Sequence, residues 1–222
     1  DPIAIIGIGC KFPGDSNTPE EFWKLICDKK DAICDIPPDR WDLEALYAPD
    51  FNRAGKMNVT KGGFVKDIDK FDPGFFGISP LEASRMDPQH RMLLEVTYNA
   101  IEDAGILLED LSGSRTCVFV GISAHDYGDI QNSPLEQVNI GAHTNIGAAL
   151  CITSNRISYT FNLKGPSISI DTACLRASAA SRNRLDSLDS MNPMCSPQSS
   201  QISDSSHSTS SSTSQPSWSI SS

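Results

Sequence analysis

The chain has 222 residues, which is enough for one or two domains, and carries a formal net charge of −10 at pH 7. This much negative charge argues against nucleic acid or an anionic membrane as a partner. No apolar run approaches the roughly 18 residues that a membrane helix needs. No basic segment precedes an apolar stretch at the start of the chain, so the sequence shows no signal peptide.

The seven cysteines form no CxxC pair and no Cys/His cluster at the spacing of a zinc site. We therefore expect no metal centre, and a reducing, cytoplasmic setting fits this cysteine usage best. The chain begins with Asp1-Pro2 rather than methionine, so we interpret it as cut from a longer chain at a domain edge.

The first apolar run, Ile3 to Ile8, is nearly continuous and predicts a strand buried on both faces. Gly7 and Gly9 begin like a dinucleotide-binding fingerprint. The third glycine is missing, however, and Pro13-Gly14 follows instead of a helix, so we expect no nucleotide site. Residues 18–21 form a capping-box pattern with proline at the first helical position, and apolar residues at helical spacing follow.

Residues 31–70 are rich in loop-forming sequence, and long loops are often functional or form interfaces. Further along, Ser79-Pro80 predicts the start of one helix. Asp87-Pro88 predicts the start of another, with apolar residues at helical spacing up to Gly105. His90 could act as a general base, but we interpret it as structural because it lies near the start of this capped helix.

Residues 116–122 alternate in a way that predicts a strand, in which Cys117 would be an unreactive core residue. Residues 126–128 are expected to open a loop. Residues 144–158 predict one helix rich in small side chains, which permit close helix packing. We interpret His143, just ahead of this helix, as a solvated loop residue.

Residues 165–174 combine a turn, a short strand and a cysteine at a strand-to-helix junction. Gly165-Pro166 is a turn signal, residues 167–170 alternate serine with isoleucine, and Asp171-Thr172 are residues that start helices. A thiol at this junction would lie over helix N-terminal amides, which lower its pKa and can stabilise the oxyanion of an attacked thioester. The alternative for Cys174 is a small buried apolar side chain.

The residue order in 165–174 closely resembles the nucleophile segment of β-ketoacyl synthase (ketosynthase) domains in modular polyketide synthases and type I fatty acid synthases. Residues 3–25, 86–105 and 144–159 are similar to the same family. The resemblance implies an α/β, thiolase-like fold with layered helix–sheet–helix architecture. It also implies that Cys174 is the catalytic, acyl-accepting cysteine of a usually dimeric enzyme.

The resemblance further implies a reaction and its carriers. An acyl group passes from a phosphopantetheine thioester on an acyl carrier protein to the cysteine, and a decarboxylated malonyl thioester then attacks it to give a β-ketoacyl product. No cofactor is expected to bind the chain directly. The family's two catalytic histidines lie in its second half, and none of the four histidines in this chain matches them by context.

The likeness ends within a few residues of Cys174, and residues 181–222 are serine-rich without sustained periodicity. Such a segment cannot bury enough apolar surface to offset its ordering entropy. We therefore predict a partial β-ketoacyl synthase N-terminal domain over residues 1–175, an incomplete half of the thiolase-like fold. Residues 176–222 are predicted to form a disordered, low-complexity tail.

Three functional interpretations follow. In the first, the chain is an acyltransferase by family that has been truncated before the catalytic histidines, and we do not expect it to condense substrates alone. In the second, it is a non-catalytic truncated product or a dimerisation module. In the third, the serine-rich tail is a phosphorylatable linker on a structural module. Only the composition of the tail favours this interpretation.

Overall fold

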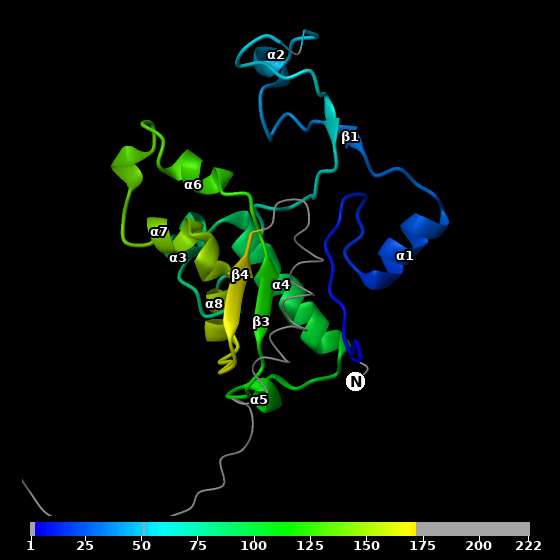
Figure 1. The fold of residues 1–222 in the computed structure, drawn as a ribbon, viewed down its shortest axis with the longest axis vertical. Coiled ribbons are helices and arrows are strands. Elements are labelled where there is room, and N and C mark those ends of the chain that lie inside the picture. The colour runs from blue at the N-terminus through cyan, green and yellow to red at the C-terminus, as the bar shows by residue number, and fades with distance from the viewer. Residues whose placement is uncertain (1–2, 51, 172–222) are drawn as a thin grey trace, which may run out of the picture. The chain divides into compact units, whose positions relative to one another are not determined.

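The computed structural model describes residues 3–50 and 52–171, so the predicted tail, the domain boundary at 175 and Cys174 lie outside the described residues. Figure 1 shows the order of the elements along the chain. They are α1 (Pro19–Cys27), β1 (Cys34–Asp35), α2 (Leu43–Leu46), β2 (Lys61–Gly62), α3 (Pro80–Arg85), α4 (Pro88–Asp103), α5 (Leu108–Leu111), β3 (Val118–Gly121), α6 (Asp126–Gln131), the short 3₁₀ turn Gln137–Asn139, α7 (Thr144–Ala148), α8 (Leu150–Thr160) and β4 (Ser167–Ile170).

The core lies between a parallel strand pair and two helices. β3 and β4 run side by side, with Val118 opposite Ser167 and Gly121 opposite Ile170. α8 packs along both strands, and α4 packs against α8. The buried apolar cluster joins these elements and the segments beside them: Met86, Leu94, Val118, Val120, Ile122, Ile157, Phe161 and Leu163. Both predicted strands of this pair are therefore confirmed.

Three helices begin where side-chain caps were predicted. Thr18 and Glu21 form the full capping box at the start of α1, and Ser79 accepts a hydrogen bond from Glu82 N at the start of α3. Asp87 caps α4 by accepting from Gln89 N at 2.7 Å. Each cap satisfies a backbone N–H group that the first helical turn leaves without a partner. α4 ends at Asp103 with Ala104 as its C-cap, and the following Gly105 has φ of 65°.

The Thr18→Ala variant is expected to lose about 1 kcal/mol of unfolding free energy, because the capping oxygen of α1 disappears. Thermal unfolding of the variant beside the parent chain measures the change. Thr18→Ser is the matched control, since it retains the hydroxyl that accepts from Glu21 N. An equal loss in both variants would contradict a capping role.

The N-terminal segment is not the buried strand that its apolar run predicted. It lies against α4, where a Cβ on Gly7 would come within 2.2 Å of the Ala100 carbonyl oxygen. Ile8 N donates to Asp103 Oδ2 at 2.8 Å, yet Ile5 is 81% exposed. Among residues 3–50 and 52–171 no strand pairs with this segment. The described part of the chain therefore contains no sheet that would bury both faces of this segment.

The prediction that Cys117 belongs to the core is also wrong, because Cys117 is exposed. It directly precedes β3, whose burial alternates: Val118 and Val120 lie in the core cluster, and Ile122 after the strand joins them. Successive side chains in a strand point to opposite faces. The odd-numbered residues therefore lie on the face away from this core.

Two connections differ from the prediction as well. Residues 126–131 form the helix α6 rather than a loop, and Tyr127 Oη donates to the Ser84 carbonyl at 3.0 Å. The single helix predicted over 144–158 is divided into α7 and α8 at Ala149. The Gly147 carbonyl accepts from Asp87 N at 2.9 Å, which removes it from the hydrogen-bond ladder that a continuous helix would need.

Candidate functional site

The predicted nucleophile, Cys174, lies outside the described residues, and its assignment stays a prediction. The segment that leads to it is described up to Asp171. Its turn depends on Gly165, because a Cβ there would come within 2.4 Å of the Thr116 carbonyl oxygen. Val118 N donates to the Pro166 carbonyl at 2.8 Å, and Ile122 N donates to the Ile170 carbonyl at 3.0 Å. Backbone hydrogen bonds thus hold both ends of β4.

The side chains of β4 divide into a serine face and an isoleucine face. Ser169 Oγ donates to Ser154 Oγ of α8 at 2.9 Å and accepts from Ser154 N at 3.2 Å. Ile168, on the other face, is 40% exposed. The alternation was visible in the sequence. The sequence did not show, however, that the serine hydroxyls rather than the isoleucines contact α8.

His90 lies in a buried polar contact between α4 and α8. It is 1% exposed, and its Nε2 lies 2.7 Å from Thr153 Oγ1. Burial, with a smaller contribution from the nearby Arg156 cation, lowers the pKa of His90 to about 4. The ring is therefore neutral near pH 7 and enclosed by helices. These contacts agree with the structural role predicted for it.

Arg156 continues this polar cluster toward α3. Its Nη1 donates to Glu82 Oε1 at 2.7 Å, and the arginine side chain is 8% exposed. Asp87 at the start of α4 is equally enclosed, and burial raises the pKa of its carboxyl despite hydrogen bonds from Gln89. These contacts join α4 to α8 and α8 to α3, and α8 in turn packs along β4. Sequence reasoning missed these pairings because the partners are far apart in the chain.

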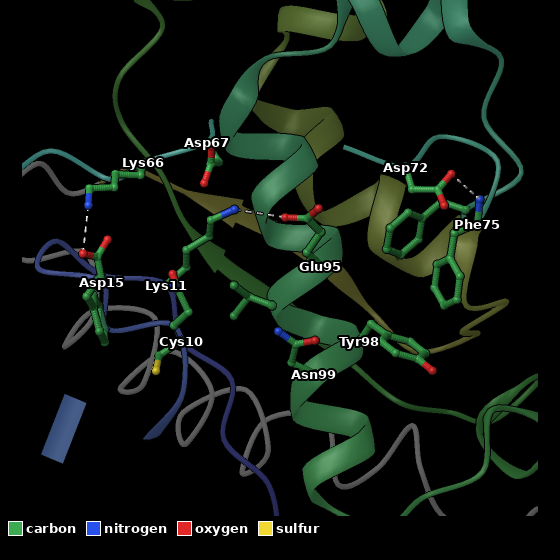
Figure 2. Close-up of a pocket in the computed structure, with 14 residues that line it drawn as sticks. Cys10, Lys11, Asp15, Lys66, Asp67, Asp72, Phe75, Glu95, Tyr98 and Asn99 are labelled. Carbon is green, nitrogen blue, oxygen red and sulfur yellow. Dashed lines mark hydrogen bonds and ion pairs between the residues drawn. The ribbon is translucent and has the colours of Figure 1, made fainter. Parts of the chain in front are cut away.

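A cavity of about 460 Å³ lies between the N-terminal segment, the loop around Lys66 and α4, as Figure 2 shows. Both of its lysines are paired, Lys11 with Glu95 at 3.3 Å and Lys66 with Asp15 at 2.8 Å. Cys10 lines the cavity, but burial, and secondarily the acidic residues of α1, raises the pKa of its thiol. This cavity therefore presents no activated nucleophile.

The other described cysteines, Cys27, Cys34, Cys117 and Cys151, are exposed. Within residues 3–50 and 52–171, no group of three or more His, Cys, Asp or Glu side chains is placed to hold a metal ion. In the same part of the chain, no helix combines the length and apolar character needed to cross a bilayer.

Comparison with known sequences identifies the family. Residues 1–190 match the β-ketoacyl synthase, N-terminal domain. One subunit of the phenolphthiocerol/phthiocerol polyketide synthase of Mycobacterium tuberculosis is 48% identical over 174 residues, which are 78% of this chain and 9% of that protein. The polyketide synthase GfsA of Streptomyces halstedii is 52% identical over 178 residues, 78% of this chain and 2% of its own length.

Solved structures support the same relationship. The oxazolomycin ketosynthase domain OzmH KS7 of Streptomyces albus matches with a TM-score of 0.77 and 33% identity, over 86% of this chain and 33% of that chain. The ketosynthase from module 6 of the bacillaene synthase of Bacillus subtilis gives a TM-score of 0.73 at 36% identity. This likeness confirms the α/β, thiolase-like fold class. The chain, which spans only about a third of these ketosynthase structures, belongs to the β-ketoacyl synthase family and carries sequence of its N-terminal domain.

Proposed function

We propose that this chain supplies the acyl-accepting part of a β-ketoacyl synthase, with Cys174 as the nucleophile. The observation that carries the proposal is β4, which pairs in register with β3 and ends directly before Asp171-Thr172-Ala173-Cys174. This segment lies within the residues that match the family. A cysteine that follows such a strand at the start of a helix would be favoured as thiolate by the helix N-terminus.

The proposed first step is acyl transfer. The Cys174 thiolate attacks the carbonyl carbon of an acyl thioester, the carbon–sulfur bond to phosphopantetheine breaks, and the departing thiolate takes up a proton. The acyl donor is the phosphopantetheine arm of an acyl carrier protein, which is the partner we propose. Backbone N–H groups beside the cysteine would stabilise the oxyanion of the tetrahedral intermediate.

The proposed second step is condensation in the full ketosynthase. A malonyl thioester loses CO₂, its carbanion attacks the acyl-cysteine carbonyl, and the thiol is released as the β-ketoacyl product forms. This step needs groups that promote decarboxylation and stabilise the enolate. His90 cannot supply them, because its ring is buried between α4 and α8. We propose that these groups come from parts of the ketosynthase outside this chain. We also propose that the complete enzyme is a dimer, as is usual in the family.

Site-resolved alkylation of the intact chain tests the nucleophile. At pH 7, iodoacetamide is expected to label Cys174 about tenfold faster than the exposed Cys27 and Cys34, because a lowered thiol pKa increases the thiolate fraction. Incubation with an acyl thioester should then add the acyl mass to the Cys174 peptide and leave the Cys174→Ala variant unmodified. Equal labelling of all exposed cysteines, without acyl transfer, would contradict the proposal.

A second candidate function is a non-catalytic interaction module. It is favoured by exposed apolar side chains in the described part of the chain, among them Ile5 at 81%, Leu135 at 89% and Val138 at 89% exposure. Exposed apolar surface of this kind is typical of interfaces. Self-association without acylation of Cys174 would select this candidate over the first.

A further inference from the structure

The cavity of about 460 Å³ beside Cys10 is bordered by three parts of the chain that are distant in sequence. They are the N-terminal turn of residues 10–17, the loop of residues 66–76 and one face of α4, as Figure 2 shows. A volume of this size lies in the range of about 300 to 1,000 Å³ that is usual for small-molecule sites. None of the residues that line the cavity belongs to β4 or to the segment that leads to Cys174.

Two ion pairs join the borders of the cavity. Lys66 of the loop pairs with Asp15 of the turn at 2.8 Å, and both side chains are exposed. Lys11 of the turn pairs with Glu95 of α4 at 3.3 Å, and these side chains are only 19% and 30% exposed. Ion pairs near the surface contribute little to stability. Their consequence for binding is that both lysines of the cavity already have an acidic partner.

Aromatic rings form most of the apolar lining. Phe75 of the loop meets Tyr98 of α4 edge to face, with ring centroids 4.8 Å apart. Phe76 packs against Phe75 at 4.9 Å, and Phe12 lines the cavity from the N-terminal turn. Aromatic side chains offer a large contact area to a flat apolar group, and their ring faces attract cations. The lining can therefore contact both a ring and a positive charge.

Carboxylates outnumber cations around the cavity. Its charged residues are two lysines and four acidic residues: Lys11, Lys66, Asp15, Asp67, Asp72 and Glu95. Among the described residues, neither Asp67 nor Asp72 forms an ion pair, and both are exposed. An anionic ligand would add to this excess of two negative charges, whereas a cationic ligand would offset it.

We propose that this cavity binds a small organic cation with an aromatic body, of the class of arylalkylammonium ions. The ring of the ligand packs among the aromatic side chains that line the cavity. Its ammonium group lies near Asp67 and Asp72, the two carboxylates of the loop that the lysines leave uncompensated. An aromatic carboxylate of the same shape is the class of ligand that the cavity disfavours.

Isothermal titration calorimetry of the full chain with phenethylammonium and, separately, with phenylacetate tests this charge preference. The two probes carry the same ring and differ chiefly in the sign of their charge. The cation is expected to bind at least about tenfold more tightly, because attraction to the carboxylates becomes repulsion for the anion. Added salt should narrow the difference, since these charges are exposed to solvent.

Substitutions locate the binding site. The Asp67→Asn/Asp72→Asn double variant is expected to bind the cation about fivefold more weakly, because exposed charge contacts contribute modestly. Asparagine also tolerates the φ of 53° at position 67. Asp69→Asn is the matched control, because Asp69 is a neighbouring exposed aspartate that pairs with Lys70 and does not line the cavity. Asn99→Trp fills the cavity from α4 and should abolish binding, with circular dichroism to verify folding.

Two results would overturn the site. One is an undetectable affinity for the cation, or an affinity equal to that for phenylacetate. The other is a preference for the cation that persists unchanged in either the double variant or a folded Asn99→Trp variant, because the cation would then bind elsewhere. Should the double variant unfold, Asp67→Asn and Asp72→Asn as single variants give the same comparison. Acylation and alkylation of Cys174 play no part in these measurements, so their outcome is independent of the proposed function.

Discussion

Leu94→Ala is expected to lower the free energy of unfolding by about 2 to 5 kcal/mol, the largest effect of a single substitution that we predict. Leu94 is fully buried in the cluster that joins α4 to β3 and α8. Truncation removes its apolar contacts and leaves a cavity that neighbouring helices fill only in part. Urea unfolding at pH 7, followed by circular dichroism, measures the change.

Leu135→Ala is the control, because it makes the same chemical change at a side chain that is 89% exposed. Its effect should stay within about 0.5 kcal/mol, as is usual for surface substitutions. If the two variants lose similar stability, the cluster around Leu94 is not the core of the folded chain.

Acidification below pH 6.5 is expected to destabilise the fold by about 3 kcal/mol through His90, since each unit of pKa difference corresponds to about 1.4 kcal/mol. The pKa of His90 falls from its ordinary 6.5 to about 4 in the folded chain, so the unfolded chain binds the proton first. Above pH 6.5 the neutral ring makes its full contribution to the free energy of unfolding. This contribution is lost progressively as the pH falls to 4, and no further loss follows below that.

Charged side chains around His90 also affect the pH dependence of stability, so the experiment needs a variant that isolates the histidine. Arg156 of α8 disfavours the imidazolium, and Glu82 of α3 pairs with Arg156. Asp87 at the start of α4 acts in the opposite direction, because its raised pKa lets the folded chain take up a proton more readily. The difference between the parent chain and His90→Gln isolates the histidine.

His90→Gln should reduce the loss of stability between pH 6.5 and 4, as measured by urea unfolding at a series of pH values. His125→Gln makes the same chemical change at an exposed histidine and serves as the control for the substitution itself. An unaltered pH dependence in His90→Gln would show that the buried ring is not the group responsible.

Local sequence determined the starts of three helices, the strand pair and the family. Thr18, Ser79 and Asp87 cap their helices by contacts within three residues, so the pattern is readable without knowledge of the fold. Period-two alternation likewise predicted β3 and β4. The residue order around Cys174 carried the resemblance to ketosynthases, which the sequence comparisons then confirmed.

Tertiary structure decided which faces are buried and which distant side chains meet. The run from Ile3 to Ile8 is apolar enough for a central strand, but a central strand is buried on both faces only within a sheet, and no strand among the described residues pairs with this run. The pairing of Ser169 with Ser154, and of His90 with Thr153 across 63 positions, depends on how α8 lies against β4 and α4. Sequence periodicity reports local conformation, because it arises from one element's own geometry. Contacts between elements depend on the packing of the whole chain, so these pairings became visible only in the folded molecule.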